Sequence, residues 1–251
     1  MNQKTAFITG ATSGIGKATA QLFARNKIRL ILCGRRIERL IRLKEELSNL
    51  TDVTTLQFDV RNKKEVFNAI ESLPTAFQKI DILINNAGNA HGLSSIQDGE
   101  LDDWDAMIDI NVKGLLYVSK AILPKMVERN DGFIVNIGSI AGKEVYPHGN
   151  VYCASKHAVN ALNKAMRVDL NNYNIRVSAI HPGAVETEFS EVRFKGDVEK
   201  ARKVYTGFKA LQAEDIADII YFVISRPYYV NIEDLIVYPT AQASATILNK
   251  E

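Results

Sequence analysis

The feature that most constrains the fold is a repeated alternation of short apolar runs with longer amphipathic stretches. The short runs predict strands at residues 5–9, 29–33, 53–58, 82–84, 133–137, 176–180 and 234–237. Apolar residues three or four positions apart predict helices over residues 17–25, 37–47, 63–73, 102–129, 151–171 and 213–223. This alternation predicts an α/β fold, a doubly wound parallel sheet with helices on both faces and right-handed crossovers.

The sequence predicts one domain over residues 1–251, because no repeat, low-complexity tract or linker composition interrupts the alternation. A content of 46% hydrophobic and 24% charged residues allows a sizeable core. The net charge is +2 and the lysines and arginines are scattered, so we expect neither a nucleic-acid partner nor a membrane-binding patch. Residues 184–207 mix aromatic and charged residues without clear periodicity, which favours a mobile lid over a site.

Several features favour a cytoplasmic enzyme. Cys33 and Cys153 fall in a predicted strand and a predicted helix, which suits free thiols in a reducing compartment. An apolar strand begins so early that no room is left for a signal peptide, and no run of eighteen apolar residues follows. No metal site is expected.

A glycine-rich turn, T-G-A-T-S-G-I-G, joins the first strand to the first helix. Glycines let the backbone approach a bulky anion, while the free N–H groups of a helix N-terminus attract phosphate. The spacing is G-x-x-x-G-x-G, not the G-x-G-x-x-G fingerprint, and a simple glycine turn is the alternative. The predicted dinucleotide contacts here are Gly10, Thr12, Ser13, Gly14, Ile15 and Gly16.

Two arginines and no acidic residue follow the second strand, as Arg35 and Arg36. An acidic residue here binds the ribose hydroxyls of NAD, whereas arginine binds the 2′-phosphate of NADP, so NADP is favoured. The alternative is that both arginines are solvated residues of the next helix. Asp59, after the third strand, is predicted either to accept from the adenine amino group or to cap the helix starting near Asn62.

Further candidate residues also follow strands, including Asn86, Ala87, Gly88 and Ser139. Because ligands of parallel sheets bind at the carboxyl ends of the strands, all these positions should converge on one rim. Asn86 is expected to tie neighbouring strands together, and Gly88 to permit a sharp turn beneath a cofactor.

The segment Y-C-A-S-K places Tyr152 and Lys156 one helical turn apart on the same face. A phenol has a pKa of about 10, and a neighbouring ammonium group lowers it, so the pair predicts a proton shuttle. The Ser139 hydroxyl would orient the same substrate oxygen. Asn111 interrupts an apolar helical stripe, so it is either satisfied structurally or holds a water near Lys156.

In this order, T-G-A-T-S-G-I-G, N-N-A-G, Asn111, Ser139, Y-C-A-S-K and H-P-G-A-V-E-T resemble the short-chain dehydrogenase/reductase family across the whole chain. The resemblance implies a Rossmann-type sheet of about seven strands, a homotetramer or dimer, and a catalytic tetrad of Asn111, Ser139, Tyr152 and Lys156. Tyr152 would act as the base, and Lys156 would also hold the nicotinamide ribose. Further implied cofactor contacts are Val60, Pro182, Gly183, Val185 and Thr187.

Segments including D-V-R-N and T-E-F-S-E-V-R-F-K-G-D resemble one subgroup, the NADP-dependent 3-hydroxy acid dehydrogenases, which act on serine, L-allo-threonine and related acids. Such a substrate carries a carboxylate that needs a cation, for which Arg193 is preferred over Lys195 because a guanidinium binds a carboxylate bidentately. The alternative is that Arg193 is a solvated surface residue of a loop. The alternatives are an NADPH-dependent reductase of other ketones or aldehydes and a non-catalytic NADP-binding regulatory protein.

Overall fold

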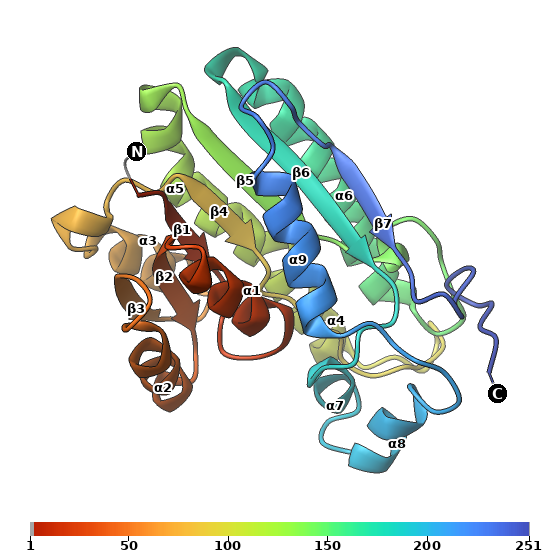
Figure 1. Ribbon diagram of the computed structural model, residues 1–251. Coiled ribbons are helices and arrows are strands. Elements are labelled where there is room, and N and C mark those ends of the chain that lie inside the picture. Colours follow the sequence, from red (N-terminus) through yellow and green to blue (C-terminus); the bar gives the residue numbers. More distant parts are fainter. Residues whose placement is uncertain (1–2, 251) are drawn as a thin grey trace.

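The computed structural model describes residues 3–250 and forms one sheet between two layers of helices (Figure 1). All its strand pairings are parallel, in the order β3-β2-β1-β4-β5-β6-β7. The predicted seven-stranded Rossmann-type sheet is therefore confirmed. The strands are β1 (Thr5–Ile8), β2 (Arg29–Gly34), β3 (Val53–Gln57), β4 (Ile82–Asn85), β5 (Gly132–Ile137), β6 (Ile175–Pro182) and β7 (Asp234–Val237).

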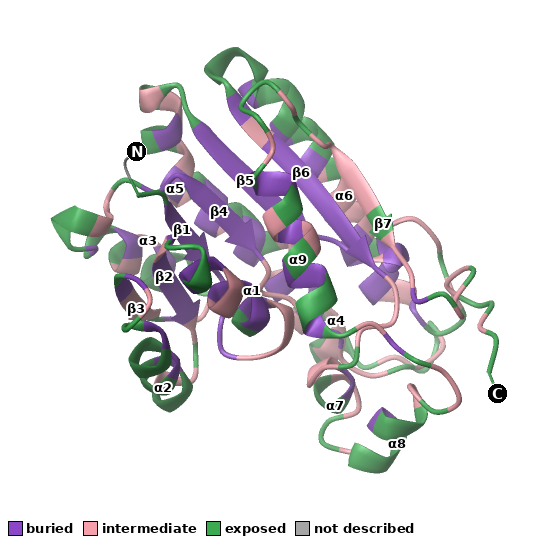
Figure 2. Ribbon diagram, viewed as in Figure 1, coloured by how far each residue is buried: buried purple, intermediate pink, exposed green. Residues whose placement is uncertain are grey.

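Each face of the sheet has its own apolar core. Side chains of α1 (Gly14–Arg25), α2 (Ile37–Leu47) and α9 (Ala213–Ile224) pack against one face. Side chains of α3 (Lys63–Glu71), α5 (Leu115–Arg129) and α6 (Asn150–Leu170) pack against the other. The central strands are buried on both faces, as Figure 2 shows, and this explains why they read as continuous apolar runs.

The predicted helix over residues 102–129 is wrong in one respect, because it is not regular throughout. It consists of α4 (Leu101–Ile108), a π-helical turn η2 (Asp109–Gly114) and α5. Asn111 lies in the π turn. A π turn changes the direction in which the local side chains point, and such turns occur often at functional sites.

Several other boundaries differ from the predicted ones. Helix α1 begins at Gly14 rather than residue 17, so two of the glycines belong to its first turn. Strand β6 includes His181 and Pro182, which were predicted to follow it. Residues 184–207 carry two short helices, α7 (Phe189–Arg193) and α8 (Val198–Lys203), which lie beyond the carboxyl ends of the strands (Figure 1). Movement of this segment stays a prediction.

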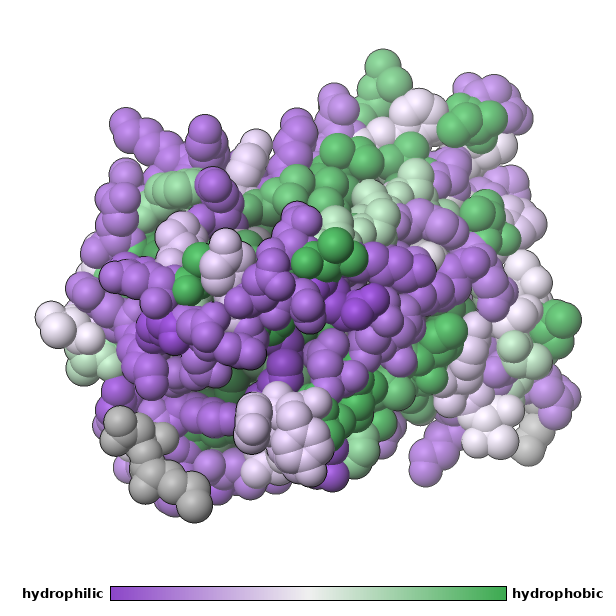
Figure 3. Space-filling view, turned by 90° about the horizontal axis from the view of Figure 1, so that it is seen from above, coloured by the Kyte–Doolittle hydropathy of each residue, from purple (hydrophilic) through white to green (hydrophobic). Residues whose placement is uncertain are grey.

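Besides the π turn η2, the described part of the chain has three short 3-10 turns. These are η1 (Thr75–Phe77), η3 (Ile140–Gly142) and η4 (Asn171–Tyr173). Within residues 3–250, no helix combines the length and apolar character needed to span a bilayer. The face seen in Figure 3 is largely hydrophilic, with hydrophobic side chains in separate groups.

Candidate active site

A cleft of about 780 Å³ runs along the carboxyl ends of the strands, from the glycine turn to Tyr152. Nearly all the predicted site residues line this cleft. The residues that follow the strands thus lie together on one rim, as the strand order predicts. The exceptions are Gly16 and Asn111, which lie behind its wall. The predicted residues that line the cleft are Gly10, Thr12, Ser13, Gly14, Ile15, Arg35, Arg36, Asp59, Val60, Asn86, Ala87, Gly88, Ser139, Tyr152, Lys156, Pro182, Gly183, Val185, Thr187 and Arg193.

The glycine turn has the geometry of a phosphate cradle. Gly10 and Gly14 have φ values of 63° and 50°, in the left-handed region that favours glycine. A Cβ on Gly16 would lie 2.4 Å from the Gly10 carbonyl oxygen, so Gly16 serves the close packing of helix on turn. Ser13 precedes α1 without a side-chain capping bond, which leaves the first N–H groups of the helix available to an anion.

The two arginines after β2 have different surroundings. Arg35 has a side chain 56% exposed and a long ion pair of 3.8 Å with Asp59. Arg36 folds back onto the glycine turn, where its Nη2 donates to the hydroxyls of Thr12 and Ser13 at 3.0 and 2.9 Å. Both guanidinium groups therefore stand at the cleft, but only that of Arg35 is largely uncommitted.

Asp59 was given two possible roles, and one is wrong. The side chain of Asn62, not Asp59, caps α3, accepting from the N–H groups of Lys64 and Glu65. Asp59 instead accepts from Arg61, and the Arg61 bonds and nearby guanidinium charges outweigh its burial and hold its pKa below the usual value. It remains on the cleft wall as a candidate contact for an adenine ring.

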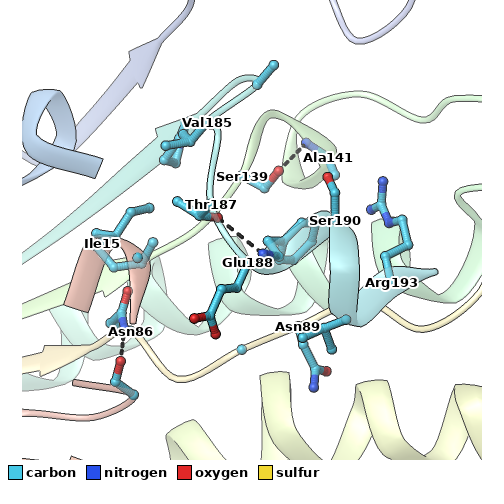
Figure 4. Close-up of a pocket in the computed structure, with 18 of the residues that line it drawn as sticks. Ile15, Asn86, Asn89, Ser139, Ala141, Val185, Thr187, Glu188, Ser190 and Arg193 are labelled. Carbon is cyan, nitrogen blue, oxygen red and sulfur yellow. Dashed lines mark hydrogen bonds between the residues drawn. The ribbon is translucent and has the colours of Figure 1, made fainter. Parts of the chain in front are cut away.

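Asn86 ties β4 to the glycine turn, as the sequence predicts. Its Nδ2 donates to the carbonyl oxygens of Thr9 and Gly10 at 2.9 and 3.2 Å (Figure 4). Next to it, Gly88 leaves no room for a side chain, because a Cβ there would lie 2.9 Å from Oδ1 of Asn111. The floor of the cleft is thus fixed by the Asn86 and Asn111 side chains against the backbone.

Tyr152 and Lys156 are both buried on α6. The Lys156 ammonium donates to the carbonyl oxygen of Ile137 at 3.0 Å, and burial lowers the pKa of Lys156 to about 8. Burial raises the pKa of Tyr152 to about 12, whereas Arg193 and the Ser139 side chain act in the opposite direction. Desolvation of the phenol therefore sets the direction of the shift, and the nearby cation that acts against it is Arg193 rather than the predicted Lys156.

Ser139 follows β5 and begins the turn η3. Its Oγ accepts from the N–H of Ala141 at 3.1 Å, which caps the turn and fixes the hydroxyl on the cleft wall (Figure 4). The Ser139 side chain also acts on the Tyr152 phenol through a hydrogen bond that lowers its pKa, so the two hydroxyls lie together.

Asn111 is satisfied within the protein. Its Nδ2 donates to the carbonyl oxygen of Asn89 at 2.8 Å and to Oγ of Ser155 at 3.0 Å, while its Oδ1 accepts from the N–H of Asn89 at 2.9 Å. Both amide hydrogens are used, which favours the structural interpretation over a water-holding role. Its contact with residues 88 and 89 links the π turn to the cleft floor.

Arg193, at the end of α7, places its guanidinium over the ring of the candidate catalytic tyrosine. Its guanidinium carbon lies 4.9 Å from the ring centroid of Tyr152 and 5.0 Å from that of Phe189. Its Nη2 donates to the hydroxyl of Tyr146 at 2.9 Å, while its buried Nε has no hydrogen-bond partner among residues 3–250. Lys195 lies outside the cleft lining and pairs with Asp103 at 2.9 Å.

Sequence reasoning missed several cleft residues. Tyr146, Glu188 and Phe189 belong to loops or a short helix with no periodic signal. The C-terminal segment, including Gln242 and Lys250, also lines the cleft. Gln242 accepts from the N–H of Ala184 at 2.9 Å, a contact across 58 positions that no local pattern could indicate. Within residues 3–250, no cluster of three or more His, Cys, Asp or Glu side chains could hold a metal ion.

The fold and the cleft define a dinucleotide-binding α/β protein, and comparison with known proteins gives its family. The family model described as short chain dehydrogenase matches residues 4–197. The chain belongs to the short-chain dehydrogenase family.

Particular relatives are similar over nearly the whole chain. NADP-dependent 3-hydroxy acid dehydrogenase YdfG of Salmonella typhi is 46% identical, covering 95% of this chain and 96% of the relative. Sulfoacetaldehyde reductase 2 of Chromohalobacter salexigens is also 46% identical, with 94% of each chain covered. A solved structure, the closed form of serine dehydrogenase complexed with NADP+, is 44% identical with a TM-score of 0.93, covering 98% of this chain and 99% of the other.

Proposed function

We propose that this protein is an NADP-dependent dehydrogenase that oxidises the 3-hydroxyl group of small 3-hydroxy acids such as L-serine and L-allo-threonine. The observation that carries this proposal is the placement of a partly unpaired guanidinium, that of Arg193, over the ring of the buried Tyr152. A carboxylate on the substrate would meet a cation within reach of the group that handles the hydroxyl proton. The similarity to 3-hydroxy acid dehydrogenase and to serine dehydrogenase supports this assignment.

The residues present fit an NADP molecule. The glycine turn and the start of α1 would hold the pyrophosphate, and Arg35 with Arg36 would hold the 2′-phosphate. Asn86, Gly88, Val185 and Thr187 also line the cleft, and the nicotinamide would lie toward its Tyr152 end. Bound NADP+ supplies the hydride acceptor.

The residues of the chain would handle the proton and the orientation of the substrate. Ser139 would donate its hydroxyl hydrogen to the substrate oxygen, and Tyr152 would take the hydroxyl proton as it is oxidised. An anionic phenolate is costly at a buried site, so the charge of Arg193, together with that of Lys156, would stabilise it. Asn111 would support this arrangement through the backbone of residues 88 and 89.

A reductase of short anionic aldehydes is the second candidate, because a relative of equal identity is a sulfoacetaldehyde reductase. Arg193 would bind a sulfonate as well as a carboxylate. We would therefore measure NADP+ reduction with L-serine, L-allo-threonine and 3-hydroxybutyrate, and NADPH oxidation with sulfoacetaldehyde and an uncharged ketone. Higher kcat/KM for the 3-hydroxy acids supports the proposal, and higher kcat/KM for sulfoacetaldehyde or the ketone contradicts it. NADPH binding without any turnover would indicate a regulatory protein.

We also propose a cytoplasmic homotetramer. Both cysteines are free and buried, which suits a reducing compartment. Val168 on α6 and Ile236 on β7 are 68% and 47% exposed, and the family resemblance places subunit contacts on the long helices. Light scattering of the purified chain tests the tetramer, and a monomer at micromolar concentration would contradict it.

A further inference from the structure

One carboxylate connects the two walls of the cleft. Glu188 immediately precedes α7, and its two oxygens accept from different guanidinium groups, Arg36 at 2.9 Å and Arg39 at 2.6 Å. Arg36 belongs to the wall formed by the end of β2 and Arg39 lies on α2, whereas Glu188 belongs to the segment 184–207. In Figure 4 the Glu188 side chain points toward the side where Ile15 and Asn86 lie, away from Arg193.

Thr187, which precedes Glu188, contacts the glycine turn at the same place. A Cβ on Gly14 would lie 3.3 Å from Cβ and Cγ2 of Thr187, so Thr187 sits directly over the glycine turn. Arg36 is itself held there by the hydroxyls of Thr12 and Ser13. The Glu188 bonds therefore close a chain of contacts from the start of α7 over the phosphate cradle to α2.

We infer that Glu188 is a positioning residue, whose ion pairs with Arg36 and Arg39 latch the start of α7 over the glycine turn and hold the cofactor cleft closed. This inference rests on the proposed function, because it takes NADPH as the occupant of the cleft. A single half-exposed ion pair usually contributes little. Here both oxygens of one carboxylate are bound, by guanidinium groups on two different residues, and charge-assisted bonds of this kind are the stronger ones.

The latch assigns different roles to the arginines. Arg36 uses Nε, Nη1 and Nη2 on protein groups, so binding a 2′-phosphate would compete with Glu188. Arg35 has no such commitment beyond its long ion pair with Asp59. Arg39 pairs with Glu188 but does not line the cleft, so replacing it weakens the latch without removing a cleft contact.

The test is the rate of cofactor release, measured by stopped-flow fluorescence after the bound cofactor is displaced by excess NADP+. Arg39→Gln and Glu188→Gln should each accelerate release of NADPH about tenfold, and the double variant should be little faster than either single one. Arg42→Gln and Glu191→Gln are matched controls. Arg42 lies on α2 with Arg39, and Glu191 lies on α7, which Glu188 precedes; neither forms an ion pair within the described part of the chain. Neither control should change the rate.

Two further comparisons separate the latch from simple attraction of phosphate. Release of NADH, which lacks the 2′-phosphate, should also accelerate in Arg39→Gln. Raising KCl from about 0.05 to 0.5 M should accelerate release of NADH more from the wild type than from Glu188→Gln, because salt screens the pyrophosphate contacts in both but the latch only in the wild type.

Two outcomes would overturn the latch alone: an Arg39→Gln rate equal to that of Arg42→Gln, or acceleration confined to NADPH. A wild-type chain that binds neither NADPH nor NADH would instead overturn the proposed function, and the latch with it.

Discussion

The guanidinium of Arg193 lies over the ring of Tyr152, 4.9 Å from its centroid, although 41 positions separate the two residues in the chain (193 − 152). Contact between a cation and an aromatic face is favourable, more so where water is excluded. The contact places α7 directly against the candidate catalytic group. It also gives the cleft a positive charge at the end where a substrate would bind.

Replacing Arg193 should affect charged substrates selectively. Arg193→Leu should lower kcat/KM for L-serine at least about a hundredfold, close to the 3 kcal/mol that a buried charge-assisted bond contributes. Reduction of an uncharged ketone should decline much less. Lys195→Leu is the matched control, because Lys195 is exposed and pairs with Asp103 outside the cleft. Equal losses for serine and the ketone would place the carboxylate contact elsewhere.

Tyr152→Phe should remove the proton shuttle and little else. The ring packs against Phe189 with 5.6 Å between centroids, and that packing does not need the hydroxyl. We expect kcat to fall about a hundred- to ten-thousandfold, the usual contribution of general acid–base catalysis, while the Kd for NADPH changes less than about threefold. Steady-state kinetics and fluorescence titration measure the two quantities. A variant with more than about a tenth of the wild-type kcat would exclude Tyr152 from this role.

The sheet and the strand-end residues could be predicted because both depend on local, periodic signals. Apolar runs identify buried parallel strands, and strand ends in such a sheet lie on one rim, so Gly10, Arg35 and Ser139 were placed correctly without knowledge of distant contacts. Glu188 and Gln242 gave no such signal. Their partners, Arg36 and the N–H of Ala184, are 152 and 58 positions away.

The local electrostatics could be predicted only in part. A tyrosine and a lysine one turn apart indicate a lowered phenol pKa, but the sequence does not show how deeply the phenol is buried. In the structure, burial dominates and raises the pKa of Tyr152 to about 12. The π turn at Asn111 was also hidden, because the apolar stripe of the surrounding helices continues through it.

Arg35 should contribute more to NADP preference than its neighbour Arg36. Its side chain is 56% exposed and largely free, whereas Arg36 is bonded to Thr12, Ser13 and Glu188. Arg35→Gln should raise the Kd for NADPH about tenfold or more and change the Kd for NADH less than about twofold, because only the 2′-phosphate interaction is lost. Isothermal titration with both cofactors provides the measurement. A smaller effect on NADPH than that of Arg36→Gln would reverse the assignment.

His181 should make the fold sensitive to acid. It is fully buried at the end of β6, where Nδ1 lies 3.2 Å from the carbonyl oxygen of Ser139 and Nε2 lies 3.5 Å from Asp234. Burial lowers the pKa of His181 to about 4. The Asp234 carboxylate raises this pKa, whereas the ammonium of Lys143, which pairs with Asp234, lowers it further. The imidazole is therefore neutral in the folded protein at pH 6, where the unfolded chain is largely protonated.

The sign of the effect follows from this difference in proton binding. Because the unfolded chain binds more protons between pH 4 and 6.5, the free energy of unfolding should decrease as the pH falls through this range, by about 3 kcal/mol in total from His181 alone. His181→Gln removes this contribution. The free energy of unfolding of the variant, minus that of the wild type, should therefore be higher at pH 4 than at pH 7 by a similar amount. Urea unfolding at several pH values measures the difference, with the exposed His148→Gln as control. If the stability difference between His181→Gln and the wild type is the same at both pH values, the imidazole has the same pKa in the folded and unfolded chain, and burial does not lower it.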